Sequence, residues 1–237
     1  MTYQDNNHTQ NNQANNNLAP IYLFYGDEEY LIQEEIKKIC DKALNDSLRD
    51  FNLQKMEAEP GKASEIIDNA STLPFMSSKR VVIVSEGEKF NKKDQEILTR
   101  YFCEPNELTC LIIYCNEVDI KTEFYKNAKK KGVVSSFRIL RGNQLLNWCQ
   151  QKAREYNYQI DKEATNYLID LIGNNLWQLD NEIKKLGIFL GEEKKITVAA
   201  IDELVSQMNT NTIFELTDLL GTKNLRQSLL LLHRILQ

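Results

Sequence analysis

Histidine is scarce in this chain of 237 residues, which contains only His8 and His233. They lie near opposite ends, so neither a Ser–His or Cys–His catalytic arrangement nor a zinc site is expected. The five cysteines form no CxxC pair, which argues against the usual redox and zinc spacings. We interpret them as reduced, mostly buried thiols of a cytoplasmic protein with no bound metal or cofactor.

Long hydrophobic runs are also absent. No apolar run approaches the roughly 20 residues that a membrane span needs, and the N-terminus has no signal-peptide pattern. No membrane partner is therefore expected. Residues 1–18 are rich in Asn and Gln without apolar periodicity, which predicts a disordered tail. The net charge of −5 argues against a protein that mainly coats nucleic acid, but it leaves room for a local basic patch.

Residues 19–140 alternate between apolar runs and amphipathic patterns. Buried strands are predicted at 21–25, 81–84, 108–114 and 132–137, with a shorter one from Phe51 to Met56. Helices are predicted from a cap at Asp27, through Ile66, and at 92–102 and 122–131. Strands that are apolar on both faces and alternate with helices predict an α/β domain with a parallel sheet.

Strand signals vanish after Arg141, and residues 141–208 are expected to form a small helical domain. Helices are predicted at 145–156, from caps at Asp161 and Thr197, and from Leu176 to a stop at Gly191. Leu171, Trp148 and Trp177 are assigned to the apolar faces of these helices. Amphipathic patterns continue to Gln237 without a stop signal, so we expect the chain to be a fragment of a longer protein.

An α/β domain followed by a small helical domain is the layout of AAA+ ATPases, but the phosphate-binding motif is missing. The turn after the first strand, residues 26–30, has one glycine, no lysine and the carboxylates of Asp27, Glu28 and Glu29. Carboxylates at a helix N-terminus would repel a polyphosphate there, so ATP hydrolysis is not expected. Acid–base or metal chemistry stays open for these three residues, although helix capping explains them more simply.

The basic run Lys126–Lys131 also has two interpretations. It could contact the phosphates of a nucleic acid. A solvated helix face explains it better, because no aromatic residues are interleaved for stacking on bases.

Three large apolar residues, Leu73, Phe75 and Met76, stand between the helix through Ile66 and the strand that begins at Val81. Ser, Thr, Pro and Lys surround them, which is typical of a surface connection. Such side chains either fold back into the core or contact a partner. Because the AAA-like frame lacks its ATP chemistry, we predict that these residues act by contact.

The sequence resembles the delta-subunit family of the bacterial DNA polymerase III clamp loader. The stretches that carry the resemblance occur in the family's order: 21–31, 73–84, Trp148, 179–186, 196–197 and 211–216. Family members usually have two aromatic residues after the proline, whereas here Phe75 is followed by Met76. The wedge stays apolar, with a flexible thioether in place of one ring.

This resemblance implies an AAA+-like subunit of a DNA-directed DNA polymerase (nucleotidyltransferase) holoenzyme that has no catalysis of its own. Such a subunit binds and opens the sliding clamp, beta, so that the ATPase and delta-prime partners load it onto primed DNA. By the resemblance, Phe75 and Met76 insert into the clamp, Leu73 supports them, and Lys79 and Arg80 lie beside the contact. Residues 209–237 would begin a C-terminal helical collar domain. The rival hypotheses are a degenerate AAA+ ATPase and a nucleic-acid-binding replication protein.

Overall fold

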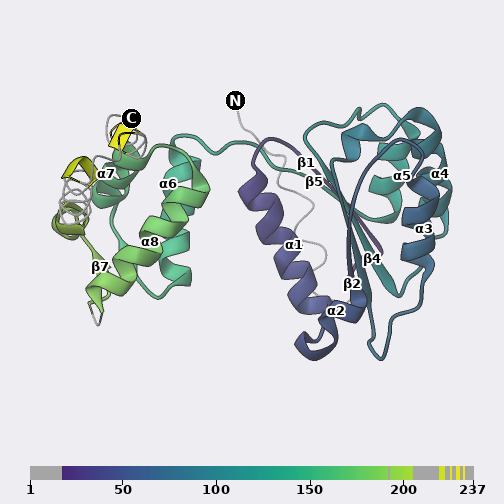
Figure 1. Ribbon diagram of the computed structural model, residues 1–237, viewed down its shortest axis with the longest axis horizontal. Coiled ribbons are helices and arrows are strands. Elements are labelled where there is room, and N and C mark those ends of the chain that lie inside the picture. Colours follow the sequence, from purple (N-terminus) through teal and green to yellow (C-terminus); the bar gives the residue numbers. More distant parts are fainter. Residues whose placement is uncertain are drawn as a thin grey trace. The chain divides into compact units, whose positions relative to one another are not determined.

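The computed structural model describes residues 18–191, 193–204, 219–221, 225, 228–229 and 232. The chain divides into two compact units, Met1–Ile139 and Leu140–Gln237 (Figure 1). Of the disordered tail predicted for residues 1–18, residues 1–17 lie outside the described residues, as does most of the predicted collar segment. Within the described part, no helix has the length and apolar character needed to cross a membrane.

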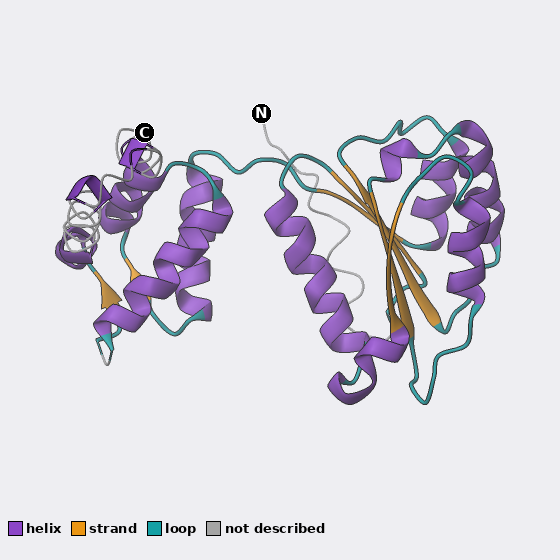
Figure 2. Cartoon of the chain, viewed as in Figure 1, coloured by secondary structure: helices purple, strands orange, loops and turns teal. Residues whose placement is uncertain are grey.

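The first unit is built on a five-stranded parallel sheet with the order β2-β3-β4-β1-β5. Its strands are β1 (Ile21–Tyr25), β2 (Leu53–Glu57), β3 (Arg80–Ser85), β4 (Thr109–Cys115) and β5 (Val133–Ser136). Its α-helices are α1 (Glu29–Ala43), α2 (Arg49–Asn52), α3 (Ala63–Ser71), α4 (Lys92–Cys103) and α5 (Glu123–Lys131). Short 3-10 helices occur at Asp46–Leu48 and Gly87–Lys89. Parallel neighbours need crossover connections, and the helices provide them (Figure 2).

Helices cover both faces of this sheet. On one face, α1 packs through Ile32, Ile36 and Ile39 on a core that includes Phe24. On the other face, α3, α4 and α5 pack on a second core that includes Leu23. Side chains of a strand alternate between its two faces, and here both faces are buried. The three central strands, β1, β3 and β4, are therefore apolar at most positions, and the predicted α/β fold with a parallel sheet is confirmed.

Two local predictions in this unit are wrong. Helix α1 begins at Glu29, and Glu28 rather than Asp27 occupies its N-cap position. The N–H of Glu28 donates to the carbonyl of Phe137 at 3.2 Å, so the turn after β1 runs one residue further than expected. Phe51 lies in the short helix α2 and not in a strand. Asn45 starts that helical stretch by accepting a hydrogen bond from the N–H of Ser47, and β2 begins only at Leu53.

A buried carboxylate, Asp94, joins the starts of α3 and α4. It is only 1% exposed and belongs to a capping box with Asn91 at the start of α4. Its oxygens also accept hydrogen bonds from the N–H groups of Gly61, at 2.9 and 3.1 Å, and of Ala63, at 3.4 Å. The N-cap residue of α3 makes no side-chain cap of its own. Asp94 therefore caps two helices at once.

Asp94→Ala is expected to lower the free energy of unfolding by about 2–3 kcal/mol, because buried N–H groups would lose their acceptor. Both tryptophans of the chain, Trp148 and Trp177, lie in the second unit. Far-UV circular dichroism during urea denaturation should show an earlier transition, while the tryptophan fluorescence transition stays in place. The exposed Glu96→Ala on the same helix is the matched control. Equal transitions for the two variants would contradict this role of Asp94.

The second unit is mainly helical, with α6 (Asn143–Glu155), α7 (Lys162–Ile172) and α8 (Leu176–Leu190) packed on one another. Asp161 caps α7 by accepting from the N–H of Ala164 at 2.9 Å, as predicted. Thr197 begins a further helical stretch, 198–204, by accepting from the N–H of Ala200 at 3.3 Å. Gly191 follows the last residue of α8, also as predicted.

The sequence missed a small sheet in this unit and misplaced two side chains. Strands β6 (Gln159–Ile160) and β7 (Lys195–Ile196) pair in parallel. At two residues each, they are too short to show a hydrophobic period. Trp177 is 50% exposed, because the buried face of α8 runs instead through Leu176, Leu179, Ile183 and Leu186. Leu171 is 45% exposed, since the buried stripe of α7 ends before its last turn.

The cysteines are all free, and four of the five are buried, as predicted. Burial raises the pKa of the Cys115 and Cys149 thiols to about 12 and that of Cys110 to about 11. These thiols therefore stay protonated near neutral pH, which suits core residues and not nucleophiles.

Candidate functional site

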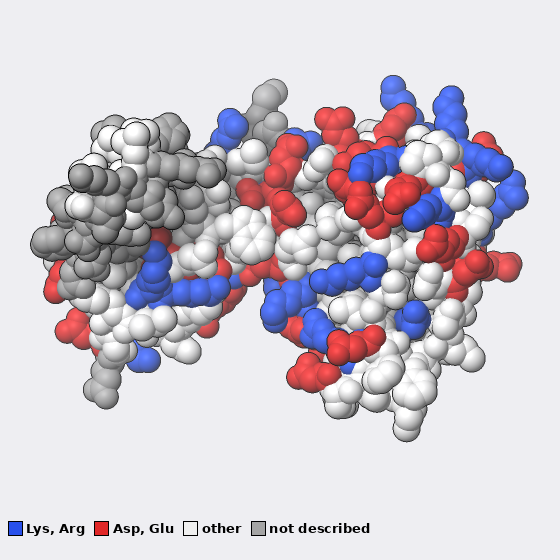
Figure 3. Space-filling view, viewed as in Figure 1, with Lys and Arg blue, Asp and Glu red and all other residues white. Residues whose placement is uncertain are grey.

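The loop between α3 and β3 exposes the three apolar residues that the sequence singled out. Leu73 is 71% exposed, Phe75 53% and Met76 78%. The loop directly precedes β3 and lies at the end of the sheet where the strands begin. The turn after β1 lies at the other end, where the strands finish, because all strands of the sheet run parallel. In the space-filling view, uncharged side chains gather at the end of the first unit near α2 (Figure 3).

A fourth apolar side chain, which the sequence did not indicate, belongs to this surface. Phe51 of α2 is 63% exposed, and its ring centroid lies 5.3 Å from that of Phe75 at an interplanar angle of 41°. We call Phe51, Leu73, Phe75 and Met76 the apolar tip. Phe51 escaped notice because its pairing with Phe75 joins positions that are distant in the sequence. An aromatic residue at the start of a predicted strand gives no signal for such a contact.

Lys79 and Arg80 lie beside the apolar tip, but the chain's own backbone engages their head groups. The Nζ of Lys79 donates to the carbonyl of Glu107. Arg80 donates from Nε to the carbonyl of Asn69 at 3.1 Å and from Nη1 to the carbonyl of Phe51 at 3.2 Å. Arg80 thus joins the last turns of α3 and α2, the two helices that carry the tip. Arg80 therefore supports the tip, whereas Lys79 is tied to the segment before β4.

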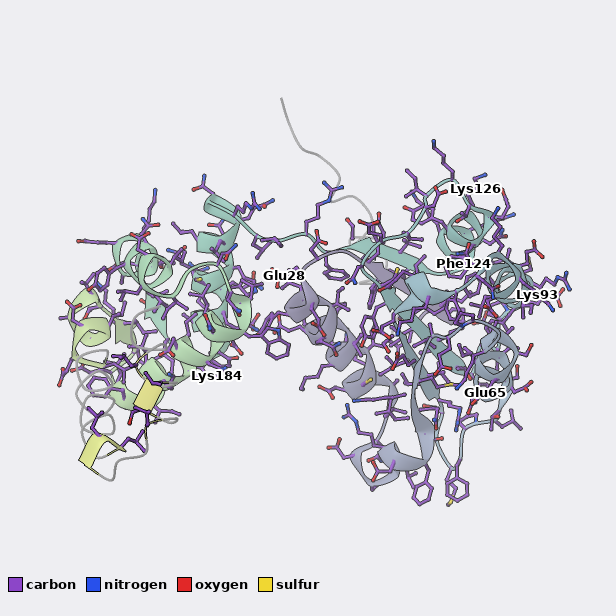
Figure 4. The ribbon with its side chains drawn as sticks, turned by 45° about the horizontal axis from the view of Figure 1, so that its top comes forward. Glu28, Glu65, Lys93, Phe124, Lys126 and Lys184 are labelled. Carbon is purple, nitrogen blue, oxygen red and sulfur yellow. The ribbon has the colours of Figure 1, made fainter. Side chains whose placement is uncertain are left out.

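The turn after β1 offers no cradle for phosphate. Gly26 has a φ of +131°, and a Cβ at this position would meet the carbonyl oxygen of Phe137 at 1.9 Å. The backbone of Phe137 therefore fills the space beside the turn. Glu28, which follows the turn (Figure 4), is buried, and the loss of solvation raises the pKa of its carboxyl group. This close approach explains the single glycine of the turn without any ligand.

The other charged groups singled out by the sequence do not assemble into a site in the described part of the chain. No cluster of His, Cys, Asp and Glu there could hold a metal ion. Asp27 and Glu29 are exposed, whereas Glu28 between them is buried. Lys126 of α5 is labelled in Figure 4 and pairs with Glu123 at 2.8 Å. Lys129, Lys130 and Lys131 are exposed on the last turn of the same helix, as a solvated face would be.

Comparison with known proteins identifies the family. The family model described as "DNA polymerase III, delta subunit" matches residues 22–138, which covers the parallel sheet and the apolar tip. The chain belongs to the family of DNA polymerase III delta subunits. A second model, described as a middle domain, matches residues 142–203 in the helical unit of this delta-family chain.

Individual relatives agree with this assignment. The chain is 27% identical over 230 residues to the DNA polymerase III subunit delta of Bacillus subtilis. It is 23% identical over 225 residues to the probable subunit delta of Aquifex aeolicus. These matches cover 93% and 91% of the chain but only 66% and 63% of the two relatives. A solved structure of the Bacillus subtilis DNA clamp loader delta protein superposes with a TM-score of 0.70 and 25% identity. That superposition covers 92% of this chain and 68% of the other.

Proposed function

We propose that this chain is a non-hydrolysing clamp-loader subunit that binds the ring-shaped sliding clamp and opens one of its interfaces. The observation that carries the proposal is the apolar tip, which is exposed and braced on a chain of the delta family. The clamp is then loaded onto primed DNA during replication by the whole complex. The work of this subunit is mechanical and takes place in the cytoplasm.

The size of the apolar tip suits an anchor in a protein interface. Fully burying a side chain such as Phe75 or Met76 contributes about 1.5–3 kcal/mol. Large aromatic side chains that enter a partner's pocket commonly carry most of the binding energy of an interface. Phe51 widens the anchor, because its ring contacts that of Phe75. The occupied pocket on the clamp is accordingly apolar.

Binding opens the ring only if the tip binds the opened clamp more tightly than the closed clamp. No ATP is needed for this step. The turn after β1, where a AAA+ ATPase would bind phosphate, lies against the Phe137 backbone in this chain. ATP binding and hydrolysis are left to the partner subunits.

The other proposed partners are the ATPase and delta-prime subunits of the clamp loader. We expect them to join this subunit through a C-terminal collar domain, as the family resemblance implies. Primed DNA is reached through the assembled complex.

The proposal is tested with the cognate sliding clamp in isothermal titration, followed by an unloading assay on nicked circular DNA. We expect a stable complex, and release of clamps from the DNA when this chain is added without ATP. Failure to bind the clamp would refute the proposal. Binding without release would refute ring opening.

Micromolar binding of ATP would favour a degenerate ATPase. Strongly salt-dependent binding of primed DNA by this chain alone would favour the nucleic-acid binder.

A further inference from the structure

A buried asparagine holds the backbone of the apolar tip. The side chain of Asn52 in α2 is fully buried, with 0% exposure. Its Oδ1 accepts a hydrogen bond from the N–H of Phe75 at 2.6 Å, and its Nδ2 donates to the carbonyl of Phe75 at 2.9 Å. The Nδ2 also donates to the carbonyl of Leu48 at 3.0 Å. One amide group therefore satisfies both polar backbone groups of the residue at the centre of the tip.

We propose that Asn52 is a positioning residue for clamp binding. It fixes the backbone of Phe75 so that the side chains of Phe75 and Met76 stand outward, and it does so without touching the clamp. This inference rests on the proposed function, because it concerns the same surface. It adds a residue and a mechanism that exposed apolar groups alone do not supply.

We call the two hydrogen bonds between the Asn52 side chain and the Phe75 backbone the latch. The conformation of the loop explains why the latch is needed. Met76 has a φ of +48°, in the left-handed region that residues with a Cβ rarely adopt. A surface loop without a latch would leave this conformation and let the apolar side chains fold back toward the protein. Holding Phe75 beforehand also reduces the entropy that is lost when the tip binds.

The chemistry of the amide is specific. A primary amide presents an acceptor and a donor side by side, and here they meet the N–H and the carbonyl of one residue, Phe75. Arg80 holds the carbonyl of Phe51, the residue just before Asn52, so the latch itself is fixed to the body of the unit. The end of α2 and the loop after α3 therefore behave as one rigid surface.

The decisive variant is Asn52→Asp, assayed for clamp binding at pH 8 and pH 6. At pH 8 the carboxylate still accepts from the N–H of Phe75 but repels the carbonyl of Phe75, so affinity should fall about 10-fold or more. Burial raises the pKa of such a carboxyl group. Lowering the pH to 6 favours the protonated form, which again offers one donor and one acceptor. The affinity relative to wild type at the same pH should then recover to within about 3-fold, one hydrogen bond to Leu48 being still lost. Both values stay above the sequence pI of about 5.3.

Two further variants make the test specific. Asn52→Ala should lose affinity at both pH values and speed the hydrogen exchange of the Phe75 N–H. Asn106→Asp is the matched control. The Nδ2 of Asn106 donates to the carbonyl of Ala70, at the end of α3 just before the tip loop, and not to Phe75. It should change clamp affinity less than about 3-fold, because the latch stays intact.

The outcomes separate this inference from the proposed function. If Phe75→Ala/Met76→Ala binds the clamp weakly while Asn52→Ala binds like wild type, the role of Asn52 is overturned and the tip stands. Folded Asn52→Ala whose Phe75 N–H exchanges at the wild-type rate also overturns that role. If Phe75→Ala/Met76→Ala binds like wild type, the assignment of the tip fails and the role of Asn52 fails with it.

Discussion

Replacing both Phe75 and Met76 by alanine should weaken binding of the sliding clamp by about 100-fold or more. Each side chain contributes about 1.5–3 kcal/mol when it is fully buried in a partner, and about 1.4 kcal/mol corresponds to a factor of ten. Both residues are exposed in the free chain, so their removal takes little from its own core. The free energy of unfolding should therefore change by no more than about 1.5 kcal/mol, mainly through the lost ring contact with Phe51. Titration calorimetry with the clamp and urea denaturation measure the two quantities.

The matched control for this variant is Ile120→Ala. Ile120 is 58% exposed in the same unit but lies between β4 and α5, at the end of the sheet where the strands finish and away from the tip. Its removal should leave clamp affinity unchanged, whereas Phe51→Ala should produce an intermediate loss. Equal affinities for Ile120→Ala and Phe75→Ala/Met76→Ala would mean that the apolar tip is not the contact.

The sequence predicted three of the four residues of the apolar tip, but neither Phe51 nor the support of the tip. Leu73, Phe75 and Met76 stood out because large apolar side chains are unusual among connection residues. Asn52 gave no such signal, since a single asparagine near a strand is ordinary. Its partner Phe75 lies 23 positions further along the chain. A tertiary hydrogen bond of this kind leaves no periodicity, so only the folded structure brings the two residues together.

The fold could be predicted because burial, unlike a tertiary hydrogen bond, leaves a pattern in the sequence. Residues such as Leu23 and Ile112 lie in strands that are buried on both faces, and such strands appear in the sequence as continuous apolar runs. Helix α8 shows where the approach fails. Trp177 follows the buried Leu176 directly, and neighbouring helical positions are rotated by about 100°, so Trp177 leaves the buried stripe. Hydrophobicity assigned the tryptophan to the core, whereas helix geometry places it half in solvent.

The turn after β1 leads to the second large expected effect. Gly26→Ala should lower the free energy of unfolding of the first unit by about 4 kcal/mol, in the range reserved for severe backbone and packing conflicts. A Cβ at Gly26 would lie 1.9 Å from the oxygen and 2.7 Å from the carbon of the Phe137 carbonyl. Phe137 cannot move aside easily. Its N–H donates to the carbonyl of Tyr25 at 2.7 Å, and its carbonyl accepts from the N–H of Glu28.

The control for this variant is Gly61→Ala, which separates backbone conformation from the steric clash. Gly61 also has a positive φ, +90°, but nothing lies within 4 Å of an added Cβ. It should cost only about 1–2 kcal/mol, the conformational share of the effect. Circular dichroism during urea denaturation should show both shifts, with the larger one for Gly26→Ala, while the tryptophan fluorescence of the second unit stays unchanged. Equal costs would mean that Phe137 yields to the added methyl group. The turn would then have room beside it, and the steric argument against a phosphate at this position would be lost.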